Sequence, residues 1–271
     1  MNEPKTVVLQ GKPGSGKSMM ACLTAVNQPV HVMDIDRKIG SAGWAQDAIA
    51  KKELTYKEID DPVDEVNIVS RVRSLVENKR ALQAPKGWET FAKHFYELPK
   101  SDQGKAAGTW VIDSATILNE HFKSHISYLA ERSKFAWDNW SALKAGWIDT
   151  LSVMRDVARE HDKDLIITVH ERIKEEPGDR STGVRYVDTK EGQQRQIVGT
   201  QDIAVWASID GAFGELLGAT CDEYYHLFVT VDGNGNPTWK CRVHPDGRRA
   251  LRTSFVLAQH EYEPDFRKIW K

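Results

Sequence analysis

The chain has 271 residues and a formal net charge of −2, with 40% hydrophobic and 28% charged residues. These proportions are ordinary for a globular protein, and the length allows one large α/β domain or one domain with appendages. No apolar run approaches the ~20 residues that a membrane span needs, so we expect no membrane contact. The charge argues against a surface uniformly adapted to nucleic acid but leaves room for a local basic groove.

The first residues, MNEPKTVV, lack the basic and apolar regions of a signal peptide. The three cysteines, Cys22, Cys221 and Cys241, are scattered and form no C-x-x-C motif. We therefore expect reduced thiols and a cytoplasmic location.

The first predicted strand, residues 7–9, leads into a phosphate-binding loop. Residues 11–18 read GKPGSGKS and match the pattern G-x-x-x-x-G-K-[ST]. In this pattern the glycines let backbone N–H groups point at phosphate oxygens, Lys17 binds the β and γ phosphates, and Ser18 ligates Mg²⁺. The apolar, helix-favouring residues 19–26 follow, so strand, loop and helix occur in the required order. We expect the nucleotide to be held by Gly11, Lys12, Pro13, Gly14, Ser15, Gly16, Lys17, Ser18 and Met19.

Further strands and helices alternate along the chain. The expected strands are 29–36, 109–114, 164–171, a hairpin within 224–243 whose turn is Asn234-Gly235, and 248–257. The expected helices are 63–82, 88–98, 114–131, 137–161 and 201–217. Residues 172–200 are polar and aperiodic, which predicts a long functional or disordered loop. This order predicts a three-layer α/β fold with a mostly parallel sheet and an antiparallel C-terminal hairpin.

Acidic residues end two of the predicted strands. Asp113 closes the apolar strand WVID, which is the Walker B position of a nucleotide site, although a strand-end Asp can also cap the next helix. Asp34 and Asp36 end the strand 29–36, and period-2 alternation places both on one face. One of them, preferentially Asp36, is a candidate to polarise water. The alternative is that they cap a loop or pair with the following Arg37 and Lys38.

The predicted strand 164–171 carries Thr168 and His170 near its end, both on one face. A histidine at this place can sense the γ-phosphate, whereas a lone histidine is more often structural.

Taken together, the chain resembles the phage nucleotide-binding proteins with a minimal RecA/RadA-like core, which include the RecA-like single-strand annealing ATPases. The resemblance covers about residues 5–265. It rests on the segments GKPGSGKS, VHVMDID, TWVIDSATIL, WSALKAGWIDTLSVMRDVAREHDKDLIITVHE, AFGELLGATCDEYYHL and CRVHPDGRRALRTSF. It implies a single RecA-like P-loop NTPase domain over 1–271, with a core at about 5–231 and a C-terminal hairpin with edge strands at about 225–257.

The resemblance assigns roles by position. Lys17 and Ser18 would bind phosphate and Mg²⁺, and Asp113 would hold Mg²⁺ through water. Asp36 falls where RecA-like enzymes usually have a Glu that activates water, and its shorter side chain implies slow hydrolysis. His170 falls where recombinases often carry a Gln that links the γ-phosphate to the DNA-binding loop.

The late hairpin of the family often supplies a Lys-x-Arg pair that reaches the ATP of the next subunit. In LRTS, Arg252 takes the first place and Ser254 the second, so that pair is incomplete. WKCR offers Lys240 and Arg242 as an intact pair. Both alternatives stay open, as does the reading of these residues as solvated hairpin charges.

In RecA-like folds the loop after the sensor strand lies along single-stranded DNA. Here its basic residues are balanced by six acids, and Tyr186 beside Arg185 offers stacking next to a phosphate contact. The candidate DNA-binding residues are Arg172, Lys174, Arg180, Arg185, Tyr186 and Arg195. Basic clusters in 71–105 and 240–252 are further candidates. The stripe of Trp137, Trp140 and Trp147 fits a core or subunit interface better than a base-stacking platform.

These features predict an ATP-binding and ATP-hydrolysing recombination protein that uses ATP and Mg²⁺, binds single-stranded DNA and promotes annealing. We expect a ring or filament of identical subunits, with a single-strand-binding protein as a further partner, in the host cytoplasm if the chain is phage-encoded. The phosphate loop begins so early that we expect the assembly surface in the core or the hairpin. A small-molecule kinase and an ATP-dependent adaptor, such as a helicase loader, remain alternatives.

Overall fold

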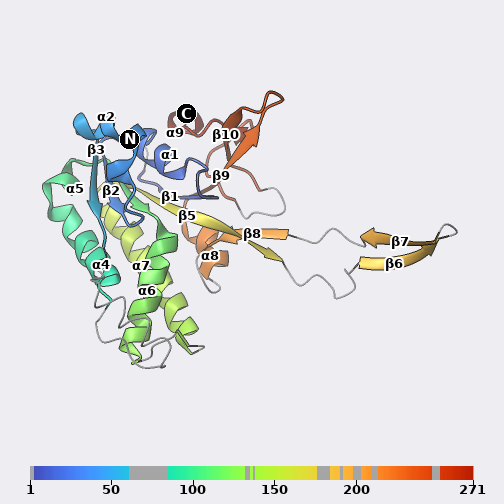
Figure 1. The fold of residues 1–271 in the computed structure, drawn as a ribbon. Coiled ribbons are helices and arrows are strands. Elements are labelled where there is room, and N and C mark those ends of the chain that lie inside the picture. The colour runs from blue at the N-terminus through green and yellow to red at the C-terminus, as the bar shows by residue number, and fades with distance from the viewer. Residues whose placement is uncertain are drawn as a thin grey trace.

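A computed structural model describes residues 3–60, 85–131, 135–136, 138–175, 184–189, 192–197, 203–208, 213–245 and 251–270. In this part of the chain the main sheet has the strand order β11-β10-β9-β1-β5-β4-β2-β3, and β8 pairs with the far end of β5 (Figure 1). Its strands are β1 (Thr6–Gly11), β2 (Val30–Asp34), β3 (Leu54–Glu58), β4 (Thr109–Asp113), β5 (Asp164–Glu175), β8 (Ile203–Ala207), β9 (Glu223–Val231), β10 (Pro237–Arg242) and β11 (Glu261–Tyr262).

The central strands are parallel, from β3 through β2, β4, β5 and β1 to β9. The C-terminal strands β10 and β11 and the inserted β8 run antiparallel to their neighbours. Successive residues of a strand face opposite sides, so Val8 of β1 packs into one core and its neighbours Val7 and Leu9 into another. Each face of the sheet is therefore buried, as parallel sheets require.

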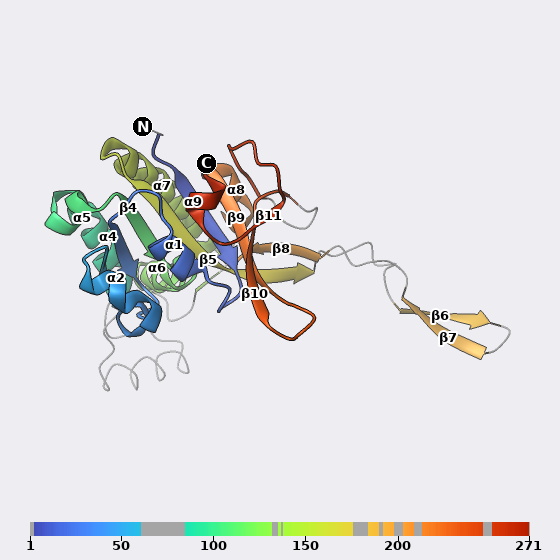
Figure 2. The same cartoon turned by 90° about the horizontal axis from the view of Figure 1, so that it is seen from above.

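Helices cover both faces. The longer ones, α4 (Gly87–Glu97), α6 (Ala115–Leu129) and α7 (Asn139–Glu160), pack on one face with α8 (Phe213–Thr220). The short α1 (Lys17–Leu23), α2 (Gln46–Ala50) and α9 (Phe266–Ile269) cover the other, as Figures 1 and 2 show. A further helix, α5 (Asp102–Ala106), precedes β4. The predicted fold class, a three-layer α/β fold with a mostly parallel sheet and an antiparallel C-terminal hairpin, is confirmed.

The elements predicted from local pattern are largely present. The helices α4, α6 and α7, the strand β4 and the hairpin β9–β10 lie within a few residues of their predicted bounds. Trp147 is 2% exposed and donates its indole N–H to Asn119 Oδ1 at 2.9 Å, so it belongs to the core. Trp140 packs against the same core, while Trp137 lies outside the described residues.

Three predictions were wrong. Residues 203–207 form β8 and not a helix, because they pair with the extension of β5, and only 213–220 are helical. Residues 172–200 were expected to be a loop, but β5 continues to Glu175, and β6 (Val184–Thr189) and β7 (Gly192–Ile197) pair as a separate two-stranded sheet. In the described part of 248–257 the chain makes a single bridge, from Arg252 to Tyr224, and no strand. The predicted helix 63–82 lies outside the described residues.

All three cysteines are buried and unpaired. Among the helices that the structure describes, none combines the length and apolar character of a bilayer span.

Candidate nucleotide site

The carboxyl ends of β1, β4 and β2 meet at one edge of the sheet, level with His170 of β5, and open α/β folds bind their ligands at this edge. A cavity of about 300 Å³ opens at this edge. Its lining comes from the phosphate loop, the two predicted acidic positions, the predicted sensor and two tryptophans. The lining residues are Pro13, Gly14, Gly16, Lys17, Ser18, Met19, Asp36, Lys38, Trp44, Asp113, His170 and Trp239.

The loop after β1 has the geometry that its glycines predict. Gly14 and Gly16 adopt φ values of 78° and 88°, which L side chains rarely adopt. At Gly11 a Cβ atom would lie 2.2 Å from the carbonyl oxygen of Leu227 on β9. The loop thus packs closely against β9 at Gly11. Its backbone is in the left-handed region at Gly14 and Gly16, just before α1 begins at Lys17.

Lys17 is 6% exposed and its ammonium donates to the carbonyl oxygens of Gly11 and Lys12 at 2.8 and 2.9 Å. Burial lowers the pKa of Lys17 to about 8, and the nearby Asp113 and Asp36 offset part of that effect. An anionic phosphate beside this ammonium would restore its charge, so the residue fits a phosphate ligand.

Asp113 lies at the end of β4, 2% exposed, with a short hydrogen bond of 2.5 Å from Thr168 Oγ1 on β5. Burial raises the pKa of Asp113, while hydrogen bonds from Thr168 and Ser18 lower it. The peptide bond that follows Asp113 is cis. The structure thus brings together the hydroxyl and the carboxylate that were predicted to hold Mg²⁺.

The two aspartates after β2 have different surroundings. Asp34 is fully buried and accepts hydrogen bonds from the backbone amides of Lys38 and Ile39 at 3.2 and 2.8 Å, so it organises the loop. Asp36 lines the cavity, where Ser114 Oγ donates to its Oδ1 at 3.0 Å and Lys38 Nζ to its Oδ2 at 2.9 Å. Asp36 therefore faces the cavity, while the role predicted for it, polarising water, stays a prediction.

His170 on β5 also faces the cavity, with its Nε2 3.9 Å from Asp36 Oδ2. Its backbone N–H donates to Thr116 Oγ1 at 2.8 Å, which ties β5 to the start of α6. Burial lowers the pKa of His170, Lys17 and Lys38 lower it further, and Asp36 and Asp113 offset part of this, so the net effect favours the neutral imidazole.

Sequence reasoning missed several residues of this edge. Trp44 and Trp239 line the cavity, and Trp239 donates its indole N–H to Gly14 O at 3.3 Å. Glu171, next to His170, meets His226 of β9 at 2.6 Å, with both side chains almost fully buried. These contacts join residues more than 50 positions apart, so no local pattern could have indicated them.

The predicted hairpin cations do not line this cavity. Arg242 stacks over Phe228 at 4.9 Å and pairs with Glu261 at 2.7 Å, and Lys240 lies 3.6 Å from the same carboxylate. Arg252 is exposed, with its guanidinium 3.4 Å from Ala219 O. Ser254 bonds to Glu223 inside its own subunit.

The predicted DNA-binding residues lie on and beyond the extension of β5. Arg172 and Lys174 belong to β5, Arg185 and Tyr186 to β6, and Arg195 to β7, where it is opposite Tyr186. Arg180 lies outside the described residues. In Figures 1 and 2 the β6–β7 ribbon lies apart from the main sheet.

The residues present fit the phosphates of a nucleotide and Mg²⁺. The buried Ser15 hydroxyl has no hydrogen-bond partner within the described part of the chain. A Cβ atom at Gly11, where the Gly11–Gly16 loop starts, would lie 2.5 Å from this hydroxyl and fill the space beside it. Among the described residues no group of three or more His, Cys, Asp or Glu could hold a metal by itself. A single carboxylate with a serine hydroxyl suits Mg²⁺, which takes its other ligands from phosphates and water.

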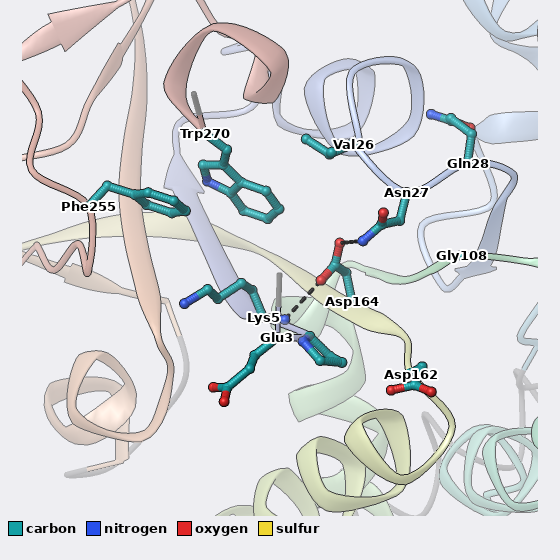
Figure 3. Close-up of a pocket in the computed structure, with 11 residues that line it drawn as sticks. Glu3, Lys5, Val26, Asn27, Gln28, Gly108, Asp162, Asp164, Phe255 and Trp270 are labelled. Atoms are coloured by element: carbon teal, nitrogen blue, oxygen red, sulfur yellow. Dashed lines mark hydrogen bonds between the residues drawn. The ribbon is translucent and has the colours of Figure 1, made fainter. Parts of the chain in front are cut away.

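A second cavity, of about 430 Å³, lies at the opposite ends of β1 and β5 (Figure 3). Phe255 and Trp270 form one wall, and Asp164 on the other accepts hydrogen bonds from Asn27 Nδ2 and the Lys5 amide, both at 2.8 Å. The polar groups of this cavity are thus bonded to one another, and Phe255 stacks on Trp270. The cavity shares no lining residue with the nucleotide site.

No protein-family profile matches the chain. No curated protein sequence matches it either. Solved structures that match include a KaiC-like protein of Pyrococcus horikoshii, with a TM-score of 0.46, 12% identity and coverage of 97% of this chain and 85% of that one. Another is the flagellar accessory protein FlaH of Methanocaldococcus jannaschii, with a TM-score of 0.42, 9% identity and coverage of 96% and 84%.

Proposed function

We propose that this chain is an ATP-binding and ATP-hydrolysing DNA recombination protein of the phage RecA-like type, which binds single-stranded DNA and promotes annealing. One observation carries the proposal. The strand β5 faces the phosphate loop with His170 and then continues without a break through Arg172 and Lys174 to Glu175. A rigid element thus runs from the nucleotide cavity into the segment proposed to contact DNA.

The chain's own groups have separable roles in this proposal. Lys17 and the loop amides hold the phosphates, and Ser18 with Asp113 holds Mg²⁺. When bound by these residues, Mg²⁺ would supply positive charge against the charge that develops on the transferred phosphoryl group. Asp36 accepts a proton from the attacking water, while Ser114 and Lys38 fix the orientation of its carboxylate. Because the Asp36 side chain is one methylene shorter than the Glu usual at this place in RecA-like enzymes, turnover is slow.

The neutral His170 is suited to report the γ-phosphate, because an imidazole can donate from one nitrogen while the other accepts. Its movement would pass along β5 to the DNA segment, and DNA bound there would stimulate hydrolysis in return. The balanced charge of this segment leaves stacking by Tyr186 and phosphate contacts by Arg185 and Arg195 as the proposed source of affinity.

Assembly into a ring or filament would place a cation of one subunit at the ATP of the next. Arg252 and the Lys240–Arg242 pair are the proposed donors. The Arg242 guanidinium is already paired with Glu261, so Arg242 would have to exchange that partner on assembly. Within the part of the chain that the structure describes, the Arg252 guanidinium donates to Ala219 O at 3.4 Å, a contact that is easier to give up.

A second candidate is an ATP-dependent adaptor with no strand pairing of its own. The ion pair of Asp36 with Lys38 favours it, because an oxygen already engaged by Lys38 is less available to orient an attacking water. The two candidates differ in whether the protein itself anneals complementary strands. If Asp36→Ala still binds ATP and still anneals DNA, the adaptor without strand pairing is excluded and hydrolysis is dispensable for annealing.

The deciding experiment measures phosphate release and assembly size with ATP, with and without single-stranded DNA at low salt. The recombination proposal expects DNA to raise both. It fails if DNA changes neither and does not bind. Phosphate release without any acceptor would also disfavour a small-molecule kinase. As the control, Lys17→Ala is expected to lose tight ATP binding, and unchanged affinity would contradict the site assignment itself.

A further inference from the structure

The indole of Trp239 lies against the apex of the phosphate loop of its own chain. Its Nε1 donates to the carbonyl oxygen of Gly14 at 3.3 Å, and its Cδ1 lies 3.3 Å from the position that a Cβ at Gly16 would take. The side chain is nonetheless 40% exposed and lines the nucleotide cavity. It is therefore a surface tryptophan that touches two glycines of the loop.

The hairpin that carries Trp239 is held at both ends. At the turn, Asp232 Oδ1 accepts the backbone amides of Asn234 and Asn236, each at 2.8 Å. At the other end, Arg242 and Lys240 bind Glu261 of β11. Cross-strand pairing places Trp239 opposite Val229 in the middle of the ribbon. The indole is thus presented by a rigid element, which is what a positioning contact requires.

The contact fixes one peptide plane of the loop. In a trans peptide the C=O and the following N–H point in opposite directions. With Gly14 O held by Trp239, the Ser15 N–H points into the loop, where it meets Lys12 O at 3.2 Å. That inward side is where the amides of such a loop bind phosphate. Without the indole, this plane would be held by the Ser15–Lys12 bond alone, and glycine permits its rotation at little cost.

We propose that Trp239 is a positioning residue for nucleotide binding, through which β10 holds the phosphate loop in its binding-competent shape. The inference rests on the proposed function, since it concerns the same loop, and adds a residue outside every motif that defines it. The hairpin would then stabilise the phosphate loop of its own chain, independently of any contact that it makes with a neighbouring subunit.

The test compares Trp239→Phe, which keeps a ring but loses the N–H donor, with Trp239→Ala, which loses both. Val231→Ala is the matched control, because Val231 is an exposed residue of the same ribbon outside the cavity. For each we would measure the Kd of a non-hydrolysable ATP analogue, the KM and kcat of ATP hydrolysis, and the Tm without nucleotide.

We expect Trp239→Phe to raise Kd and KM about two- to tenfold, as loss of one hydrogen bond does, and Trp239→Ala to raise them further. The kcat and the nucleotide-free Tm should stay near those of the parent protein and of Val231→Ala. Unchanged Kd and KM in both Trp239 variants would overturn the inference, as would a loss confined to kcat or to Tm. Failure of Lys17→Ala to weaken binding would instead overturn the proposed function, so the two failures are distinguishable.

Discussion

Thr168 Oγ1 of β5 and Asp113 Oδ1 at the end of β4 lie 2.5 Å apart. Both residues are buried, so this hydrogen bond acts where little solvent competes with it. It holds the carboxylate in place and favours its ionised form against the effect of burial. The neighbouring strand therefore takes part in preparing the proposed Mg²⁺ position.

The first prediction concerns that bond. Thr168→Val keeps the side-chain shape but removes the donor, so the pKa of Asp113 rises further and the carboxylate holds Mg²⁺ less well. We expect a several-fold higher Mg²⁺ concentration for half-maximal ATP hydrolysis and a loss of about 1–3 kcal/mol in the free energy of unfolding. A Mg²⁺ titration and urea unfolding measure the two effects.

Thr109→Val is the matched control for this variant. Thr109 is equally buried on β4 and donates to Asn27 O at 2.7 Å, but at the opposite end of the strand. It should lower stability to a similar degree and leave the Mg²⁺ midpoint where it was. Equal Mg²⁺ midpoints in both variants would argue against a role for Thr168 at the metal position.

The second prediction separates Asp34 from Asp36. Asp36→Ala should lower turnover about 100-fold or more, as loss of a general base does, with ATP affinity little changed. Asp34→Ala should instead lower stability by about 1–3 kcal/mol, because the amides of Lys38 and Ile39 lose their buried acceptor. Single-turnover hydrolysis and thermal unfolding of both variants test this contrast. An Asp36→Ala protein with full turnover would remove Asp36 from the chemistry.

The sequence predicted this edge of the sheet well because each signal was local. The loop GKPGSGKS fixes its own backbone through its glycines, and WVID and ITVH are apolar runs that end in polar residues. Carboxyl ends of parallel strands share one edge, so Asp113 and His170 had to lie near Lys17. The choice between Asp34 and Asp36 was harder, because β2 ends at Asp34 and the period-2 argument does not extend past a strand.

Other features depended on pairing between distant segments. Residues 203–207 read IAVWA, a short apolar run that periodicity does not assign to strand or helix. Pairing with the extension of β5 decides that it is β8. In the same way, Trp239 reaches Gly14 only because β9 lies beside β1 and β10 folds back on β9. Such tertiary contacts override local preference, and one sequence does not reveal them.

The third prediction concerns His170. A neutral imidazole and a Gln amide both offer a donor and an acceptor, so His170→Gln should keep the proposed stimulation of ATP hydrolysis by single-stranded DNA. His170→Ala should keep basal hydrolysis and lose about tenfold or more of that stimulation, within the range of known couplings. Steady-state hydrolysis with increasing DNA distinguishes the variants. Full stimulation of His170→Ala would mean that β5 does not carry the signal through this side chain.

The last prediction follows from the pKa of Lys17, which burial lowers to about 8. Phosphate binding needs the ammonium form, so above pH 8 the free protein must first take up a proton. The Kd for ATP should be nearly flat below pH 8 and weaken by up to about tenfold per pH unit above it. In Lys17→Arg the guanidinium stays charged, so whatever its affinity, this dependence should vanish.

Stability should change in the opposite direction over the same range. The unfolded chain has the higher Lys17 pKa, about 10.5, so between pH 8 and 10.5 it binds more protons than the folded protein. The Lys17 contribution to the free energy of unfolding therefore rises with pH in this window and is constant outside it. Subtracting the stability curve of Lys17→Met from that of the parent protein isolates the contribution. A difference curve that is flat or falls from pH 8 to 10.5 would contradict a buried, partly neutralised Lys17.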